Sequence, residues 1–183
     1  MVEIRNISSF EDVVIIPNSL IVIDIDDTLI KYSQFNQTWW INKIQHYHNL
    51  TKNYELAEHL ANEEWNKHIE TCEPEIVDKY IHDFIDMAKS NDCHIVLLTA
   101  RNDIIRELTK KHLLEVNLYF EHIYFNKDKG SELVKIVETD YAGIYKNIIV
   151  IDDMEKNLLN IRNKMNLSKY ELQLYKITRE IVK

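Results

Sequence analysis

Four short apolar segments constrain the fold of this chain more than any other feature. They are residues 20–23, 95–98, 123–125 and 148–151. Each is continuously apolar and rich in β-branched side chains, which is typical of strands buried on both faces of a parallel sheet. Segments with helical spacing follow three of them, at residues 103–114, 131–138 and 154–163. This alternation predicts a three-layer α/β protein with a Rossmann-like parallel sheet between two layers of helices. A last segment, residues 170–177, alternates apolar and polar side chains and predicts an edge strand.

The interval between the first two predicted strands, residues 31–92, has a different character. Its apolar residues recur with helical spacing in three sets: Trp39, Trp40, Ile41 and Ile44; Ala57, Ala61, Trp65 and Ile69; and Val77, Ile81, Phe84, Ile85 and Ala88. Pro74 is expected in the first turn of the third helix. We interpret the interval as a helical cap inserted into an α/β core formed by residues 1–30 and 93–183. Its eleven acids outnumber its six lysines, so a roof that it forms over a site is acidic.

Charge and composition exclude several classes of partner. The formal net charge is −8, which argues against a protein whose main partner is a nucleic-acid backbone. Residues 1–11 are polar and lack the apolar centre of a signal peptide. The apolar stretch at residues 13–25 is interrupted by Pro17 and is too short to span a bilayer. The two cysteines fit a reducing compartment. We therefore expect a soluble cytoplasmic protein that binds neither nucleic acid nor membrane, whose oligomeric state the sequence leaves open.

Polar residues follow each of the four predicted core strands at its carboxyl end. They are Asp24, Asp26, Asp27 and Thr28 after the first, Thr99 after the second, Lys127 and Lys129 after the third, and Asp152 and Asp153 after the fourth. Each group alone is ordinary, as part of a turn, a helix cap or a solvated loop. Together they lie at the edge of the sheet where open α/β proteins bind ligands. The order of these groups, each at the end of a strand, favours a catalytic site. Burying this many acids without a metal would be costly, which favours a bound cation.

These segments, in this order, resemble the four motifs of the haloacid dehalogenase superfamily. The first motif corresponds to Asp24-Ile-Asp-Asp-Thr28, and a hydroxyl residue, a lysine that opens a helix and an acidic pair follow in turn. The resemblance covers roughly residues 7–177 and implies a strand order of 5-4-1-2-3. The lead-in at residues 6–11, the Trp39-Trp40 pair and the phrase Leu98-Thr-Ala-Arg101 are similar to one uncharacterised branch, known mainly as a domain of unknown function.

The resemblance implies catalytic roles for two carboxylates. Asp24 would attack phosphorus and form an aspartyl-phosphate, which splits hydrolysis into two steps. Asp26 would protonate the leaving group and later take a proton from water. Thr99, Ala100 and Lys129 would bind the phosphoryl group.

The resemblance also implies a Mg²⁺ site, which an oxygen-rich set of ligands without thiols suits. Asp24, the backbone carbonyl of Asp26 and Asp153 would bind the metal. The choice between Asp153 and Asp152 as direct ligand stays open, with Asp153 favoured. Thr28, Asp152 and Asn157 would support the site.

The sequence therefore predicts a magnesium-dependent phosphomonoester hydrolase that acts on a small phosphorylated molecule. A phosphomutase or another phosphoryl transferase of the same fold stays open, as does a non-catalytic binding protein of this fold. Asp26 speaks against a dehalogenase, and the order of the motifs speaks against a signalling receiver domain. His46 and His48 lie two residues apart and would face different ways on a helix, which disfavours zinc. Arg101 would either contact substrate or brace its loop.

Overall fold

A six-stranded, all-parallel sheet forms the centre of the computed structural model, which describes residues 2–178. Its order is β1-β8-β7-β2-β5-β6. The strands are β1 (Ile4–Ile7), β2 (Ser19–Ile23), β5 (His94–Thr99), β6 (Ile123–Phe125), β7 (Asn147–Asp152) and β8 (Glu171–Ile177). All five residues of β2 are buried, because β2 pairs with β5 on one side and β7 on the other. The continuous apolar runs therefore reflect strands that are covered on both faces.

The order β8-β7-β2-β5-β6 is the 5-4-1-2-3 order that the resemblance to the haloacid dehalogenase superfamily implied, and the three-layer fold is confirmed. The prediction of an edge position for residues 170–177 is wrong. β8 lies between β7 and β1, and β1 takes the edge. β1 has only four residues, with Arg5 and Asn6 exposed between half-buried and buried isoleucines, so its sequence carries no clear strand pattern.

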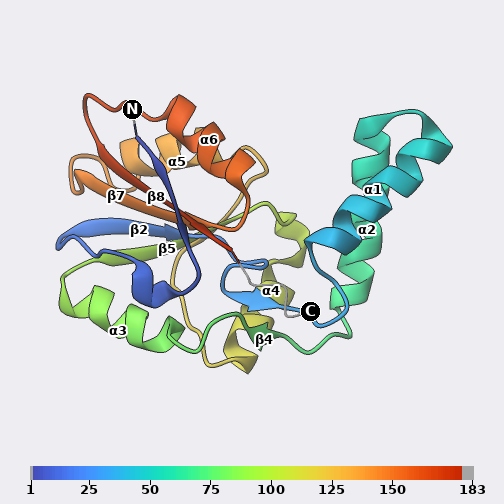
Figure 1. Ribbon diagram of the computed structural model, residues 1–183, viewed down its shortest axis with the longest axis horizontal. Coiled ribbons are helices and arrows are strands. Elements are labelled where there is room, and N and C mark those ends of the chain that lie inside the picture. The colour runs from blue at the N-terminus through green and yellow to red at the C-terminus, as the bar shows by residue number, and fades with distance from the viewer. Residues whose placement is uncertain (1, 179–183) are drawn as a thin grey trace.

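Helices cover both faces of the sheet and bury two apolar clusters (Figure 1). On one face, α3 (Ile81–Ser90) and α4 (Arg106–Glu115) pack over side chains such as Ile21, Ile23 and Leu97. On the other, α5 (Lys129–Glu138) and α6 (Glu155–Lys164) pack over Leu20 and Val22. The alternate residues of β2 thus supply both clusters, as the two-residue period of a strand requires. Two short 3-10 helices, η1 (Phe10–Asp12) and η2 (Asp103–Ile105), precede β2 and α4.

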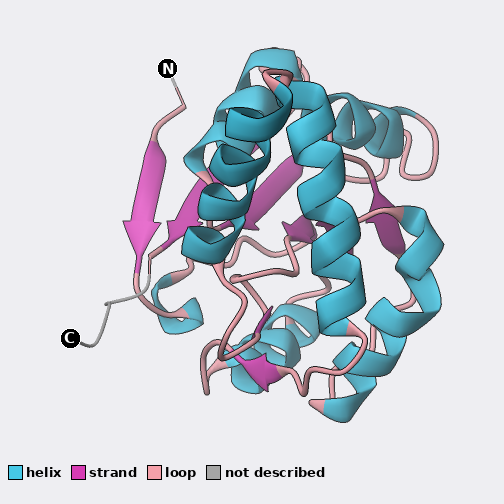
Figure 2. Cartoon of the chain, turned by 90° about the vertical axis from the view of Figure 1, so that its right-hand side faces the viewer, coloured by secondary structure: helices cyan, strands magenta, loops and turns pink. Residues whose placement is uncertain are grey.

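A helical hairpin projects from the body of the molecule, as Figures 1 and 2 show. It consists of α1 (Gln37–Thr51) and α2 (Tyr54–Ile69), and Asn36 and Asn53 cap the two helices by accepting from the backbone N–H groups of Trp39 and Leu56. Ile44, Ala57 and Ala61 form a small seam between the helices. A short antiparallel pair, β3 (Ile30–Lys31) and β4 (Glu75–Ile76), lies at the base of the hairpin.

The rest of the interval 31–92 does not project. Pro74 precedes β4, and α3 begins only at Ile81, so the prediction that Pro74 opens the third helix is wrong. The residues after Pro74 pair with β3 instead of starting a helix. The apolar face of α3, with Ile81, Phe84 and Ala88, packs in the cluster beneath the sheet. Between residues 2 and 178, no helix has the length and apolar character needed to cross a bilayer.

The close approach of α5 to α6 depends on Gly130. A Cβ atom at this position would lie 2.7 Å from the backbone carbonyl oxygen of Asn160 and would also strike the Asn160 side chain. Overpacking of this kind costs about 1–3 kcal/mol. We expect Gly130→Ala to lower the free energy of unfolding by about that amount in urea titrations. The control Glu138→Ala changes an exposed residue of the same helix and should stay within about 0.5 kcal/mol of the wild type. An equal effect of the two substitutions would contradict the tight packing.

Candidate active site

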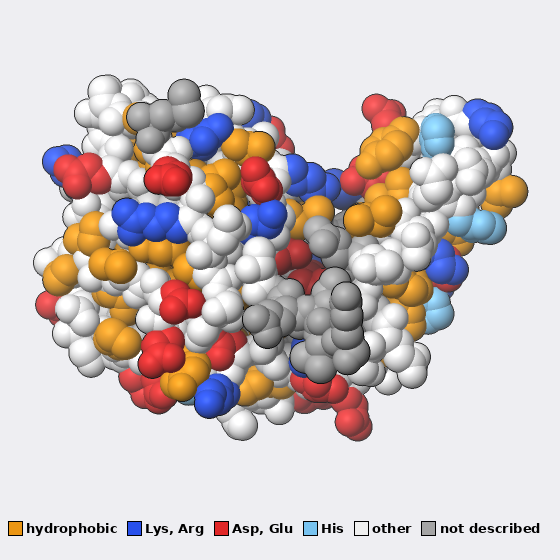
Figure 3. Space-filling model, in the orientation of Figure 1, with side chains coloured by type: hydrophobic (Ala, Val, Ile, Leu, Met, Phe, Trp, Pro, Cys, Tyr) orange, Lys and Arg blue, Asp and Glu red, His pale blue; other side chains and the backbone are white. Residues whose placement is uncertain are grey.

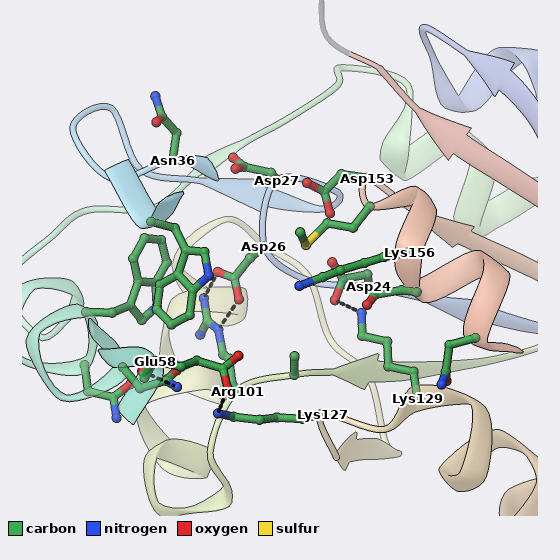
Figure 4. Close-up of a pocket in the computed structure, with 18 residues that line it drawn as sticks. Asp24, Asp26, Asp27, Asn36, Glu58, Arg101, Lys127, Lys129, Asp153 and Lys156 are labelled. Carbon is green, nitrogen blue, oxygen red and sulfur yellow. Dashed lines mark hydrogen bonds and ion pairs between the residues drawn. The ribbon is translucent and has the colours of Figure 1, made fainter. Parts of the chain in front are cut away.

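The carboxyl ends of β2 and β7 place two carboxylates side by side. Asp24 follows β2 directly, Asp152 ends β7, and the two strands are paired along their length. The backbone N–H of Asp24 donates to the carbonyl of Ile151 at 3.0 Å, which extends the pairing into the site. Adjacent parallel strands end at the same edge of a sheet, so the acids converge although 128 positions separate Asp24 from Asp152 (152 − 24). Figure 4 shows Asp24 at this edge, with Lys129 bonded to it and Asp153 nearby.

Lys129 lies between these two carboxylates and is buried, with 2% of its side chain exposed. Its Nζ is 2.5 Å from Asp24 Oδ1 and 2.7 Å from Asp152 Oδ2. Burial alone would lower the pKa of the Lys129 ammonium, but the charges and hydrogen bonds of Asp152 and Asp24 raise it above its ordinary value. Lys129 is therefore a permanent cation in the site. Lys127 is half exposed instead and pairs with Glu58 of α2 at 3.4 Å.

Asp24, Asp152 and Asp153 form a cluster in which one oxygen of each carboxylate lies within 4.8 Å of the others. Burial, followed by repulsion from Asp152 and Asp26, raises the pKa of Asp24 to about 7, although Lys129 opposes the rise. Burial and repulsion from Asp24 and Asp152 raise the pKa of Asp153 to about 9. These raised pKa values reflect three carboxylates that repel one another when ionised, with the one positive charge of Lys129 between them. A hard divalent cation with oxygen ligands would stabilise the ionised form of this cluster, and Mg²⁺ is such a cation.

Asp152 and Asp153 differ in how much of their hydrogen-bonding capacity is free. Asp152 Oδ1 accepts from the backbone N–H of Met154 at 2.8 Å and from Asn157 Nδ2 at 3.0 Å, while Oδ2 accepts from Lys129. Among the described residues, none donates a hydrogen bond to the Asp153 carboxylate, which lines the pocket. This difference favours Asp153 as a direct metal ligand and Asp152 as a residue that orients Lys129.

The Thr28 hydroxyl connects the carboxyl ends of β2 and β7. Its hydroxyl donates to Asp24 Oδ2 at 3.4 Å and accepts from the backbone N–H of Asp153 at 3.1 Å. Thr28 is fully buried, so its hydroxyl is held in this position. The preceding residue, Asp27, has a φ of 58°, which turns the chain sharply out of the site. Asp and Asn adopt this left-handed conformation more readily than most residues with a side chain.

Asp26 forms a bidentate ion pair with Arg101. The Arg101 Nε and Nη2 atoms donate to Asp26 Oδ2 at 2.8 Å and Oδ1 at 2.7 Å. The Arg101 side chain is 2% exposed, whereas that of Asp26 is 29% exposed and borders the pocket. Asp26 therefore presents one side to solvent and the other to a buried guanidinium.

A cavity of about 350 Å³ lies between the sheet edge and the hairpin, in the notch that Figure 3 shows. The body lines it with Asp24, Asp26, Asp27, Ala100, Arg101, Lys127, Lys129, Asp153, Met154, Lys156, Asn157 and Asn160. The hairpin side lines it with Asn36, Trp40, Glu58, Asn62, Trp65 and Asn66. Lys156 extends from α6 toward the cavity in Figure 4.

The structure brings most of the predicted site residues to this cavity. Asp24, Asp26, Ala100, Lys129, Asp153 and Asn157 line it, while Thr28, Thr99 and Asp152 are buried behind its surface. The Thr99 hydroxyl accepts from the backbone N–H of Arg101 at 3.1 Å. Asn157 contacts Asp152 directly. The catalytic and binding roles of these residues stay predictions.

Sequence reasoning did not place the hairpin residues that face the cavity. Four of them share one face of α2, because Glu58, Asn62, Trp65 and Asn66 are spaced at i, i+4, i+7 and i+8. The same spacing is present in the sequence, but the side of a helix that turns toward a site depends on tertiary packing.

The fold and the site define a three-layer α/β protein with a haloacid dehalogenase-like fold and an acidic site at the carboxyl edge of its sheet. The chain belongs to the family described as "Protein of unknown function (DUF2608)", which matches residues 3–127. A Thermotoga maritima crystal structure, provisionally named as a beta-phosphoglucomutase, is similar in fold with a TM-score of 0.55. The two chains are 14% identical, and the match covers 90% of this chain and 88% of that one. No curated protein matches this chain in sequence.

The unequal surroundings of the two neighbouring acids predict unequal effects on metal binding. Mg²⁺ should raise the melting temperature of the wild type, because a ligand at 100 times its Kd stabilises the folded state by about 2.7 kcal/mol. Asp153→Asn should remove this rise, because it removes the free carboxylate. Asp152→Asn should weaken Mg²⁺ binding by about 10–100-fold, as changes behind a metal ligand do.

Calorimetric titration of Mg²⁺ into each variant measures these effects. Glu155→Gln, an exposed substitution at the start of α6, is the control and should bind Mg²⁺ like the wild type. If Asp152→Asn loses binding while Asp153→Asn retains it, the ligand role belongs to Asp152.

Proposed function

We propose that this protein is a Mg²⁺-dependent phosphomonoester hydrolase that acts through an aspartyl-phosphate on Asp24. The observation that carries the proposal is the position of the Asp24 carboxylate. It borders a cavity, one of its oxygens is fixed by Lys129, and it belongs to a cluster of acids that fits a divalent cation. A carboxylate held in this way, beside a permanent cation, can approach a phosphoryl group that it would otherwise repel.

The reaction would proceed in two steps. An oxygen of Asp24 forms a bond to phosphorus while the bond from phosphorus to the leaving oxygen breaks. Water then attacks the phosphorus of the aspartyl-phosphate, and the bond to Asp24 breaks to release inorganic phosphate. Lys129 balances charge on the phosphoryl oxygens and on Asp24 in both steps. Asp24, Asp153 and the carbonyl of Asp26 would hold Mg²⁺, which supplies further neutralisation of the phosphoryl charge when bound.

Asp26 would handle the protons. It gives a proton to the departing oxygen in the first step and takes one from the attacking water in the second. Its partly exposed carboxylate borders the same cavity as Asp24, which supports this role. The phosphoryl group would sit against the loop of Thr99 and Ala100, next to Lys129.

A phosphomutase is the second candidate, because the similar structure from Thermotoga maritima is named for that activity. The two activities share the first step and differ in the acceptor of the phosphoryl group. Water receives it in a hydrolase, and a second hydroxyl of the substrate receives it in a mutase. Product analysis by ³¹P NMR separates them, since only the hydrolase accumulates inorganic phosphate.

The hairpin side of the cavity supports a small substrate. Asn62 and Asn66 contribute carboxamides, Trp40 and Trp65 contribute indole rings, and Glu58 contributes a carboxylate. Among the described residues of the hairpin, no lysine or arginine lines the cavity. A substrate with one phosphoryl group and a small polar remainder matches this wall, which offers a polyanion no additional cation.

The division of labour between two acids gives the central prediction. Asp24→Asn should abolish turnover of every phosphate ester, because it removes the nucleophile. Asp26→Ala should still be phosphorylated by p-nitrophenyl phosphate, whose leaving group departs without a proton, but should release phosphate slowly. A burst of nitrophenolate and covalent phosphate in acid-quenched protein should appear. With an alkyl phosphate, the same variant should lose about 10²–10⁴-fold in rate and show no burst.

Stopped-flow absorbance and mass spectrometry of the quenched protein make the measurement. Asp83→Asn, on the exposed side of α3, is the control and should behave like the wild type. Equal losses of Asp26→Ala on both substrates, with no trapped phosphate, would show that Asp26 does not act as acid and base.

The size of the cavity and the lack of lysine and arginine among the described residues of its hairpin wall predict discrimination by size and charge. A 3′-phosphorylated oligonucleotide should have a kcat/KM far below that of the best small phosphate ester, because its further nucleotides exceed a cavity of about 350 Å³ and its additional phosphates approach the acids of the site. Raising the salt concentration should narrow the gap, since screening weakens repulsion between exposed charges. Comparable turnover of both substrates at low salt would refute the proposed substrate class.

A further inference from the structure

Arg101 has more hydrogen-bond partners than a residue that merely lines a cavity needs. Two of its donors hold the Asp26 carboxylate. Nη1 donates to Thr109 Oγ1 at 3.0 Å, and Nη2 also donates to the hydroxyl of Tyr32 at 2.9 Å. Four of the five N–H donors of a guanidinium thus point at fixed protein acceptors. The Arg101 side chain is almost wholly buried, so these bonds are protected from water.

The hydroxyl groups that accept hydrogen bonds from Arg101 are themselves held in place. The Tyr32 hydroxyl lies 2.7 Å from His112 Nδ1. Burial, together with the charge of Arg101, lowers the pKa of His112 to about 4, so the imidazole is neutral near pH 7. Burial raises the pKa of Tyr32 to about 12 against the effect of Arg101, so the phenol keeps its proton. Tyr32 therefore donates to His112 and accepts from Arg101. The Thr109 hydroxyl donates to the carbonyl of Ile105 at 2.9 Å and accepts from Arg101 in the same way.

The network joins separate parts of the chain around one carboxylate. Tyr32 follows β3 at the base of the hairpin, while Thr109 and His112 lie on α4. Arg101 is two residues beyond the end of β5. A guanidinium bound from three sides cannot swing toward a ligand without leaving buried acceptors unpaired, which is costly. The planar guanidinium instead donates through Nε and Nη2 in parallel, and this defines the plane in which both oxygens of Asp26 must lie.

We propose that Arg101 is a positioning residue that orients Asp26 for the reaction, and that Tyr32 and Thr109 hold Arg101 in turn. This inference rests on the proposed function, because it gives Asp26 a reaction to serve. The sequence left two roles open for Arg101, contact with substrate or bracing of its loop. The bonds of Arg101 to Asp26, Tyr32 and Thr109 favour a supporting role over contact with substrate, and they extend that role from the loop to Asp26. Arg101 acts on the rate through Asp26 and makes no separate contribution to binding.

A double-mutant cycle tests the assignment. Steady-state rates on an alkyl phosphate would be measured for the wild type, Arg101→Met, Asp26→Ala and the double variant. If Arg101 acts through Asp26, Arg101→Met lowers kcat within the range of about 10²–10⁴-fold that general acid–base help supplies, and KM stays close to that of the wild type. In the Asp26→Ala background, the same change should have no further effect, because residues that act as a unit are strongly non-additive. A raised KM, or losses that multiply in the double variant, would overturn the proposal in favour of contact with substrate.

Milder variants keep the test valid if Arg101→Met does not fold. Thr109→Val and Tyr32→Phe each remove one acceptor from the guanidinium while preserving side-chain shape, and each should lower kcat with KM unchanged. Arg101→Lys keeps the positive charge but cannot donate two parallel hydrogen bonds to Asp26, so it should retain only part of the wild-type kcat. Guanidinium ion added to Arg101→Ala should restore kcat in part, which a purely structural defect would not allow. Unchanged kcat in both Thr109→Val and Tyr32→Phe would overturn the role given to these residues.

Arg106→Met is the matched control. Arg106 lies five positions further on, donates to the carbonyl of Ile123 at 3.0 Å and pairs with Asp103 at 2.6 Å, but it does not line the cavity. Its removal should leave kcat and KM unchanged. A wild type that hydrolyses no phosphate ester would overturn the proposed function and this inference with it. An active wild type with a multiplicative cycle would overturn this inference alone.

Discussion

The buried contact of Lys129 with Asp24 and Asp152 is the interaction on which the arrangement of the site depends. Three charged groups lie almost out of reach of water, and each is tolerable only because the others are present. Lys129 reaches them because α5 begins directly at the sheet edge and Gly130 lets α5 approach α6 closely. Removing either acid would leave the ammonium with one partner, so the geometry of Asp24 is tied to the packing of two helices.

Parallel pairing makes this concentration of charge possible. The acids of β2 and β7 meet at one edge because neighbouring strands end there, while the apolar parts of both strands are buried on either face. Stability and chemistry are therefore divided along each strand. The apolar residues hold the layers together, and the first polar residue beyond them enters the site. A divalent cation would relieve the repulsion between the clustered carboxylates.

Strands that are buried on both faces could be predicted from the sequence, because a short, continuous run of β-branched residues between helical segments is typical of such strands. β1 could not be predicted, because a strand of four residues with Arg5 and Asn6 exposed carries no clear hydrophobic pattern. Without β1, the prediction placed β8 at the edge of the sheet. The acids at the strand ends were predicted for the same topological reason. The ion pair of Asp26 with Arg101 was not predicted, since it joins residues 75 positions apart through a tertiary contact.

Two sides of α2 have separate structural tasks. Ala57 and Ala61 hold the hairpin together on one side of the helix, and Glu58, Asn62 and Asn66 face the cavity on another. Substitutions at the second set change what the cavity accepts without disturbing the seam or the sheet edge. Changes on the cavity side of the hairpin should therefore cost little stability, whereas Asp24, Lys129 and their partners depend on one another. Such a division would let the shape and polarity of the cavity change through one side of one helix while the sheet edge stays as it is.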